Sequence, residues 1–407
     1  MSASGGPTPP RREIALVVQR YGEAITGGSE QLARALAERL AERFRVSVYT
    51  TCARDYVSWR SELPEGEREE GGVRVLRFAA EEERDLASFN RLSDGLYGRP
   101  ASREEELHWL RRQGPYVPRL VERLRADHDR YAAVLFFTYL YYPTVAGLAA
   151  VPERSILVST AHDEPAIRLG IFREAFARAR AFAFLTPPEA ELVERLFGVG
   201  GRPAAVAGIG IDTGPPPDVE AFKIRHDVVG PYALYAGRID AGKGCAELVD
   251  FYSSYRRDRR GAAELLLVGR LAMPEPRAPG ARYLGFLPEE EKRAALAGAA
   301  AVVCPSPYES LSIVLLEGMA LGAPALASAR SPVLVDHCRR SNAGLYYASR
   351  EEFGECLDLL VTQERLRGAL SANGRGYVLR EYGWPAVLDR YLRLIEAVGE
   401  DGSARAS

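Results

Sequence analysis

The stretch YALYAGRIDAGKGCAELVDFYSSYRR, residues 232–257, shows how this chain is organised. It opens with an apolar run, 232–237, which is typical of a strand in a parallel sheet. A glycine-rich loop follows, and the residues from Glu247 to Arg257 then place apolar side chains at helical spacing. A strand, a loop and a helix in this order predict an α/β fold.

The same alternation of short apolar runs and longer amphipathic segments extends in both directions. After residue 257 the predicted strands are 264–269, 281–286, 300–306, 323–328 and 344–349. A first series, before residue 232, comprises 14–19, 46–50, 73–78, 133–138, 155–161, 181–186 and 204–208. Because the pattern restarts, the sequence predicts two Rossmann-like, doubly wound domains. Such sheets bind ligands at the carboxyl ends of their strands, so two facing domains would share a central cleft.

A proline-rich segment separates the two series. Three consecutive prolines in GIDTGPPPD can continue neither a helix nor a central strand, so we interpret residues 214–218 as an interdomain linker. The N-terminal domain then covers 13–213 and the C-terminal domain 219–380. Residues 1–12 and 399–407 are small and polar, and we expect them to be disordered.

Composition excludes several classes of function. The 407 residues carry 53 Lys plus Arg and 55 Asp plus Glu, a net charge of −2, which lacks the cationic field that nucleic-acid binding needs. Five scattered cysteines without a CxxC pair argue against a disulfide framework and a cysteine zinc site. No apolar stretch resembles a signal peptide or a spanning helix, which predicts a cytoplasmic protein. Peripheral membrane association is possible but not indicated, because no strongly basic amphipathic helix stands out.

The loop GRIDAGKG, residues 237–244, nearly matches the phosphate-loop pattern GxxxxGK[ST]. Gly244 stands where such loops carry the hydroxyl that holds magnesium, so the metal ligand is absent. Arg238 and Lys243 remain, and this pair suits a diphosphate bound without metal. The alternative is two solvated charges in a turn.

The block PSPYESLSIVLLEGMALGAPALAS, residues 305–328, carries two glutamates with seven residues between them. Glu309 falls on the loop before a predicted helix and Glu317 within that helix, about two turns from its start. The backbone N–H groups near Ser312 and Ile313 would favour an anion at the helix N-terminus. Glu317 lies among apolar residues and needs a partner, for which ligand hydroxyls would serve. The alternative is a cap and a solvated charge.

Three motifs in this order, GGSE at 27–30, GRIDAGKG and Glu309-x7-Glu317, resemble a family-4 glycosyltransferase of the GT-B fold. The resemblance implies transfer of a sugar from a UDP- or GDP-sugar with retention of configuration, without an essential metal or cofactor. It also implies that a last helix, residues 381–398, crosses back to the first domain. Ser310, Leu311 and Ser312 depart from the Gly-Phe-Gly stretch that many members have after the first glutamate.

The resemblance also implies roles for individual residues. Arg238 and Lys243 would hold the donor diphosphate and stabilise its growing charge, Glu309 the hydroxyls of the transferred sugar, and Glu317 the ribose. His162 directly follows the predicted strand 155–161, where the family places a histidine beside the reacting sugar. Asp163 would orient its ring. The alternative for His162 is a packed or surface histidine.

Glycines and aromatic residues complete the predicted site. Gly27 and Gly28 open the first strand-to-helix turn, where glycine permits close approach to an acceptor or a phosphate, or simply forms a tight turn. Tyr139 and Tyr142 follow a strand and line either the acceptor side or the core. Phe286 and its neighbours are candidates for contacts to the nucleotide base.

The predicted function is therefore transfer to a saccharide, lipid-linked or secondary-metabolite acceptor. Two alternatives stay open. One is a non-catalytic partner protein that binds a sugar nucleotide, and the other is a GT-B enzyme of another kind, an epimerase or a phosphorylase. A dehydrogenase is unsupported, because GIGIDTG lacks the GxGxxG spacing. Asp127, His128 and Asp129 precede a predicted strand and are interpreted as a solvated loop, not as a manganese site.

Overall fold

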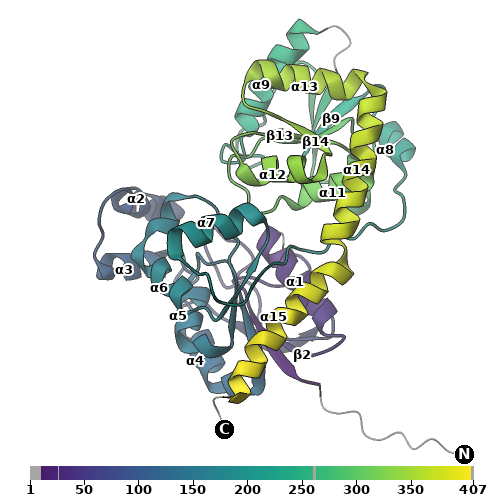
Figure 1. Cartoon of the computed structure of the whole chain (residues 1–407). Coiled ribbons are helices and arrows are strands. Elements are labelled where there is room, and N and C mark those ends of the chain that lie inside the picture. Colours follow the sequence, from purple (N-terminus) through teal and green to yellow (C-terminus); the bar gives the residue numbers. More distant parts are fainter. Residues whose placement is uncertain (1–10, 26, 260–262, 405–407) are drawn as a thin grey trace, which may run out of the picture. The chain divides into compact units, whose positions relative to one another are not determined.

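The computed structural model describes residues 11–25, 27–259 and 263–404, with side chains described up to residue 399. Contacts divide them into two compact units. The first comprises the described residues of Met1–Leu185, Glu189–Ala207 and Leu388–Ser407. The second comprises those of Thr186–Pro188 and Gly208–Val387. In each unit, helices pack around one sheet (Figure 1).

The first unit contains an 8-stranded sheet in the order β3-β4-β2-β1-β5-β6-β7-β8. All neighbouring strands are parallel except β3 and β4. The strands are β1 Glu13–Val17, β2 Arg45–Thr51, β3 Gly66–Glu70, β4 Val73–Phe78, β5 Tyr131–Phe137, β6 Ser155–Val158, β7 Ala181–Phe184 and β8 Ala204–Val206. The helices are α1 Gly28–Leu40, α2 Leu86–Leu96, α3 Arg103–Gln113, α4 Pro118–Asp127, α5 Tyr142–Ala150, α6 Gly170–Arg178 and α7 Pro187–Phe197.

The second unit contains a 6-stranded, fully parallel sheet in the order β11-β10-β9-β12-β13-β14. The strands are β9 Tyr232–Ala236, β10 Glu264–Val268, β11 Ala281–Gly285, β12 Ala301–Cys304, β13 Ala325–Ser328 and β14 Gly344–Tyr347. The helices are α8 Val219–Arg225, α9 Cys245–Asp258, α10 Glu289–Ala297, α11 Ile313–Leu321, α12 Pro332–Ser341, α13 Arg350–Thr362 and α14 Glu364–Tyr382.

Each predicted apolar run forms a strand, and most of these strands are buried within the two sheets. Leu16, Phe136, Leu234 and Leu266, for example, have no exposed surface. The outer strands β8, β11 and β14 are partly exposed. The sequence analysis missed β3, whose residues GEREE are charged and largely exposed. This strand lies at the edge of its sheet and pairs antiparallel with β4 across Gly71 and Gly72, which have φ of 59° and 76°. Two consecutive glycines with positive φ form a hairpin turn, and this pair was the available signal.

The predicted linker at 214–218 lies inside the second unit, because the boundary between the units falls at residues 207 and 208. The guanidinium of Arg293, on α10, donates hydrogen bonds to the carbonyls of Asp212, at 3.3 Å, and Pro215, at 3.0 Å. The proline segment is therefore held against that unit and does not separate two domains.

The last helix, α15, spans Trp384–Ala404 and starts three residues later than 381. From Leu388 onward its residues belong to the first unit, where Tyr391, Ile395 and Val398 are buried. Residues 399–404 are helical, so the expectation of disorder is wrong for this part of the tail. Residues 11–12 are ordered, while 1–10 and 405–407 lie outside the described residues.

Candidate functional site

The loop between β9 and α9 lies at the carboxyl edge of the second sheet. Gly237 follows β9 and donates its N–H to the carbonyl of Val268 at 2.9 Å. Gly269, with φ of 136°, lies so close that a Cβ there would meet the Gly237 carbonyl oxygen at 1.8 Å. Only glycine fits at this position, and the two loops are therefore in direct backbone contact.

Lys243 joins this loop to the next one along the sheet. Its Nζ donates to Glu309 Oε1 at 2.7 Å, and its backbone N–H donates to Asp240 Oδ1 at 2.7 Å. Gly244 has a left-handed φ of 76°, and a Cβ there would meet the carbonyl oxygen of Pro305 at 2.7 Å. The β9–α9 and β12–α11 loops thus touch, and the structure brings Lys243 and Glu309 together as a partly exposed ion pair.

Arg238 and Phe286 are placed at the same edge, on separate loops. The side chain of Arg238 is 43% exposed and forms an ion pair with Asp240. Phe286, at the end of the β11 segment, is 61% exposed, and the guanidinium of Arg270 lies 5.4 Å from its ring centroid. An exposed aromatic ring beside a cation suits a planar ligand.

Ser312 precedes α11 in a left-handed conformation, with φ of 68°. A positive φ is uncommon for a residue other than glycine, so the surroundings must hold Ser312 in this conformation. Within the described residues no side chain caps this helix end, and Leu315 and Leu316 both donate their N–H groups to the Ser312 carbonyl. The N–H of Ile313, the first residue of α11, lies at the positive end of the helix dipole.

His337, on α12, holds the backbone just before Ser312. The ring is fully buried, its Nε2 lies 2.9 Å from the Leu311 carbonyl oxygen, and its Nδ1 lies 3.0 Å from the Tyr377 hydroxyl. A carbonyl can only accept, so Nε2 donates and Nδ1 of the neutral ring accepts from Tyr377. Burial lowers the pKa of His337 to about 4, so the ring is neutral near pH 7.

Glu317 has a partner within the protein. Its carboxylate lies 3.0 Å from Lys292 Nζ, and Lys292 also contacts Glu289 on the same helix, α10, at 2.9 Å. Glu317 was expected to need a partner, and α10 supplies one, a lysine that the sequence pattern did not reveal. Burial raises the pKa of Glu317, while Lys292 opposes this effect.

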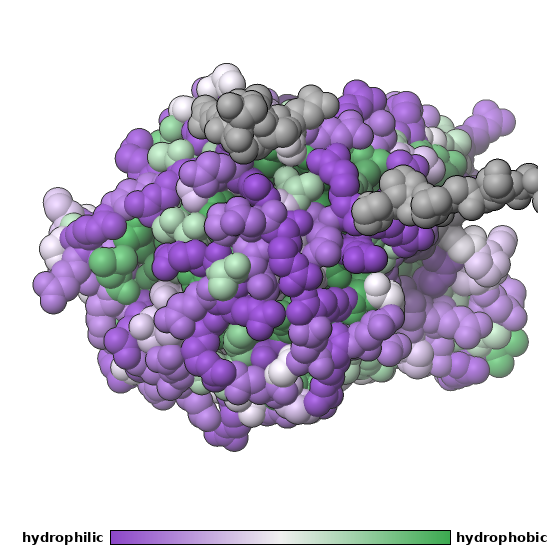
Figure 2. Space-filling view, turned by 90° about the horizontal axis from the view of Figure 1, so that it is seen from below, coloured by the Kyte–Doolittle hydropathy of each residue, from purple (hydrophilic) through white to green (hydrophobic). Residues whose placement is uncertain are grey.

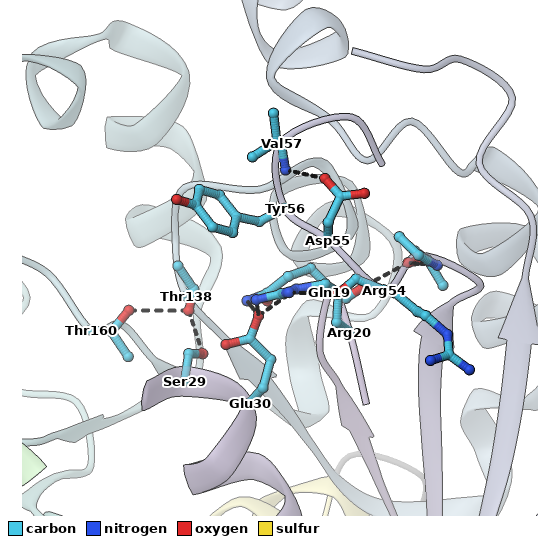
Figure 3. A network of polar contacts seen from close by, with 12 residues as sticks. Gln19, Arg20, Ser29, Glu30, Arg54, Asp55, Tyr56, Val57, Thr138 and Thr160 are labelled. Carbon is cyan, nitrogen blue, oxygen red and sulfur yellow. Dashed lines mark hydrogen bonds and ion pairs between the residues drawn. The ribbon is translucent and has the colours of Figure 1, made fainter. Parts of the chain in front are cut away.

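The first unit has its own polar network at the carboxyl edge of β1 (Figure 3). Glu30, on α1, accepts from Arg20 Nη2 at 2.6 Å and from Gln19 Nε2 at 3.0 Å, and the side chains of Arg20 and Glu30 are each 6% exposed. A Cβ on Gly27 would meet Glu30 Oε2 at 2.3 Å, and Gly28 begins α1. Gly27 thus makes room for a buried ion pair of the protein itself.

A cluster of hydroxyl groups lies beside this network. Ser29 Oγ, on α1, is 2.6 Å from Thr138 Oγ1, which accepts from Thr160 Oγ1 at 3.2 Å (Figure 3). Thr138 follows β5 and Thr160 follows β6, with left-handed φ of 65° and 50°. The strand order reverses between β1 and β5, which is where doubly wound sheets bind ligands.

His162 lies two residues beyond Thr160. Its Nε2 is 3.5 Å from Glu164 Oε2, and the two side chains are 32% and 24% exposed. Asp163 was expected to orient this ring, but its carboxylate binds Arg168 at 2.6 Å instead. Burial opposes ionisation of Glu164, yet contacts with His162 and Tyr139 outweigh it and lower the pKa of Glu164.

The two tyrosines predicted for an acceptor have different places. Tyr139 is 1% exposed, donates to Glu164 Oε1 at 2.6 Å and packs edge-on against Phe172 at 4.8 Å. Its ring is covered by the core and is not available to a sugar. Tyr142 is half-buried at the start of α5 and contacts the Tyr116 ring, with centroids 4.8 Å apart.

Asp127 was interpreted as part of a solvated loop, but it ends α4 and accepts from the Tyr49 hydroxyl and from Arg123, both at 2.7 Å. Among residues 11–25, 27–259 and 263–404, no group of three His, Cys, Asp or Glu is placed to hold a metal ion. None of the described helices is both long and apolar enough to cross a membrane. The face in Figure 2 is mainly hydrophilic, with hydrophobic residues in small groups.

Sequence reasoning missed four residues that shape these sites: Arg20, Glu189, Lys292 and His337. Each of them acts on a residue distant in the chain, and only Glu189, in the first turn of a helix after two prolines, has a local signal. Its carboxylate accepts from Ser159 Oγ at 2.5 Å and from the N–H groups of Ala161, at 2.7 Å, and Leu185, at 2.6 Å.

Comparisons with known proteins relate this geometry to carbohydrate enzymes. Residues 218–377 match the model of the family described as Glycosyl transferases group 1. Over 107 residues the chain is 31% identical to O-antigen chain mannosyltransferase B of Escherichia coli, a segment that makes up 24% of this chain and 28% of that protein. The chain thus spans less than a third of the curated relative it matches.

Solved structures are similar over nearly the whole chain. Sucrose-phosphate synthase from Thermosynechococcus elongatus has a TM-score of 0.72 and 18% identity, over 98% of this chain and 100% of that one. HepE of Anabaena, in complex with UDP and glucose, has a TM-score of 0.67 and 14% identity, over 96% of this chain and 100% of HepE. WaaG, a glycosyltransferase involved in lipopolysaccharide biosynthesis, has a TM-score of 0.62 and 16% identity, over 92% of this chain and 98% of WaaG. The predicted fold class, with two Rossmann-like domains of the GT-B type, is confirmed.

The buried neutral His337 predicts a specific dependence of stability on pH. The unfolded chain binds a proton at this histidine near pH 6.5 and the folded chain only near pH 4, so acidification in this window favours unfolding. Between pH 7 and pH 5 we expect the free energy of unfolding of the parent to fall by about 2 kcal/mol more than that of His337→Gln, which keeps a donor but does not titrate.

Urea unfolding at both pH values measures this difference. His108→Gln, at an exposed position, is the control and should behave like the parent. Equal acid sensitivity of the parent and His337→Gln would contradict the prediction.

Proposed function

We propose that this chain is a retaining hexosyltransferase of the family-4 type, which moves a sugar from a UDP- or GDP-sugar to a saccharide, lipid-linked or secondary-metabolite acceptor. The ion pair between Lys243 and Glu309, at 2.7 Å, carries the proposal. It joins two loops at the carboxyl edge of the second sheet, inside the segment 218–377 that matches Glycosyl transferases group 1. The spacing Glu309-x7-Glu317 and the loop GRIDAGKG assign this edge to the donor.

In the proposed mechanism the protein acts mainly by electrostatics. The bond between the sugar and the diphosphate breaks while an acceptor hydroxyl attacks from the same face, so negative charge grows on the leaving diphosphate, whose oxygen takes up the hydroxyl proton. Arg238 and Lys243 neutralise that charge, and the N–H of Ile313 adds a dipole at the start of α11. When the diphosphate binds, Lys243 exchanges part of its contact with Glu309 for a phosphate oxygen. Glu309 then becomes available to the sugar hydroxyls.

The remaining assignments follow from the resemblance. Glu317 binds the ribose hydroxyls, and its pair with Lys292 favours the ionised form of the carboxylate and orients it. Phe286, largely exposed, is assigned to the base. In the first unit His162 is assigned to the reacting sugar, with Glu164 fixing the ring. At the β1–α1 loop, Gly27 is assigned to the acceptor and Gly28 to the donor.

Known structures suggest which donors to test first. HepE of Anabaena was solved in complex with UDP-glucose, and the relative in Escherichia coli is named a mannosyltransferase. A panel of UDP-glucose and GDP-mannose, with and without candidate acceptors, therefore begins the assay. Nucleotide diphosphate released only with an acceptor supports transfer. Binding without release points to the non-catalytic partner, and conversion of the sugar nucleotide without acceptor points to an epimerase.

The cations at the donor edge should dominate turnover. We expect Lys243→Ala and Arg238→Ala each to lower kcat about 100-fold, as the removal of a contact to a developing anion does. Lys223→Ala, on α8 in the same unit, is the control, because its ammonium pairs with Glu220 at 3.2 Å on the surface. Rates of nucleotide release measure the effect, and near-parental rates in both variants would remove the diphosphate role.

Transfer should not need a divalent metal. Gly244 leaves the loop without the hydroxyl that phosphate loops use for magnesium, so Arg238 and Lys243 carry the neutralising charge. We expect the transfer rate in EDTA to stay within about twofold of the untreated rate, because removing an ion that does not stabilise the transition state leaves the activation barrier unchanged. Activity that disappears in EDTA and returns with manganese or magnesium would contradict the proposal.

Binding and chemistry should separate among three residues. Glu317→Ala should weaken the affinity for free nucleotide diphosphate, because its assigned contact is to the ribose. Glu309→Ala and His162→Ala should bind the free nucleotide nearly as the parent does but lose transfer, since their contacts are made at the reacting centre. Calorimetry with nucleotide alone, beside the transfer assay, gives both values. A His162→Ala variant that transfers like the parent would place the reacting centre elsewhere.

A further inference from the structure

Glu189 is a buried carboxyl group for which neither the fold nor the proposed donor site accounts. It lies in the first turn of α7 and is 1% exposed. A carboxyl group withdrawn from water is costly unless several donors satisfy it. The donors around Glu189 come from the ends of two neighbouring parallel strands, β6 and β7.

The contacts of Glu189 surround a single residue. Oε1 accepts from Ser159 Oγ at 2.5 Å and from Ala161 N at 2.7 Å, and Thr160 lies between these two residues. Oε2 accepts from Leu185 N at 2.6 Å, just beyond β7. One carboxylate thus ties the residues on both sides of Thr160 to the end of the adjacent strand.

Thr160 has a left-handed φ of 50°. A β-branched residue rarely adopts this conformation, and it persists only where the surroundings hold it. Glu189 supplies that hold from both sides. As a result, Thr160 Oγ1 reaches Thr138 Oγ1 at 3.2 Å, and the chain leaves the turn directly toward His162. Ala161, whose N–H binds the Glu189 carboxylate, directly precedes His162 in the chain.

The charge of Glu189 determines how many of these bonds form. An ionised carboxylate accepts all three hydrogen bonds, whereas the protonated acid turns one oxygen into a donor that faces other donors. Burial raises the pKa of Glu189 to about 7, although the hydrogen bonds from Ser159, Leu185 and Ala161 lower it. His162 and, on α15, Tyr391 are titratable groups that interact electrostatically with Glu189.

We infer that Glu189 is a positioning residue, whose carboxylate holds the turn at Thr160 and thereby sets the place of the His162 ring. The effect of Glu189 on sugar transfer rests on the proposed function, whereas its effect on the position of the His162 ring does not. Glu189 touches no substrate in this assignment. Its hydrogen bonds fix the backbone between Ser159 and His162, and its charge also interacts with that of His162.

The first test needs no substrate. Histidine ring resonances are recorded by NMR on the full chain labelled at its histidines, and His162 is assigned from its loss in His162→Gln. Glu189→Gln should shift the His162 resonance and leave the other histidines in place. Glu191→Gln, an exposed glutamate on the same helix, should shift none of them. An unchanged His162 resonance in a folded Glu189→Gln protein would overturn the inference.

Ser159→Ala provides a second variant where Glu189→Gln fails to fold. It removes one donor and keeps the carboxylate, so the His162 resonance should shift by a smaller amount in the same direction. A His162 resonance identical to that of the parent would again overturn the inference.

The second test uses the transfer assay. Glu189→Gln should lower kcat by about 10-fold or more while the donor KM and the affinity for free nucleotide stay within about twofold, because the nucleotide is assigned to the other unit. The parent kcat should fall as the pH drops below about 7, and this decline should be absent in the variant. Unchanged kcat, or equal losses in kcat and nucleotide affinity, would contradict a positioning role. A parent that transfers no sugar contradicts the proposed function, and the NMR test then decides this inference alone.

Discussion

Parallel pairing of the strands is the constraint on which the sites of this protein depend. A parallel strand must be reached through a crossover, so the loops that follow successive strands gather at one edge of the sheet. In the second sheet this brings the loop after β9 against the loop after β12, and Lys243 reaches Glu309 across 66 residues of sequence. In the first sheet the same constraint brings Ser29, Thr138 and Thr160 together after β1, β5 and β6. The chemistry is concentrated at the strand ends because the backbone leaves no other place for it.

Internal pairing of charges is common to both sites. Lys243 holds Glu309, Lys292 holds Glu317, and Arg20 holds Glu30. Such pairs keep ionised groups satisfied where water is scarce, and they fix the direction in which each group points. At the carboxyl edge of the second sheet, Lys243 and Glu309 stay partly exposed. The pair Arg20–Glu30 is buried, which suits a structural part of the β1–α1 loop.

Two buried titratable groups support the strained backbone beside these sites. His337 holds the carbonyl before Ser312, and Glu189 holds the residues around Thr160. Both supported residues have positive φ, a conformation that needs help from outside the loop. In each case burial shifts the pKa toward the neutral form, downward for the histidine and upward for the acid. The conformation of each loop is thus coupled to the protonation of a buried residue, His337 or Glu189, to which no ligand contact is assigned.

The sequence by itself predicted the architecture, because short apolar runs that alternate with amphipathic segments favour parallel strands covered by helices. It also singled out Lys243, Glu309 and Glu317 as candidate site residues, since these lie in local motifs. Only the tertiary structure assigned Lys292 to Glu317, Glu164 to His162 in place of Asp163, and Tyr139 to the core. The edge strand β3, the extent of α15 and the place of the proline segment also depended on it. These features arise from contacts between distant segments, and local periodicity carries no record of which side chain comes to lie opposite another.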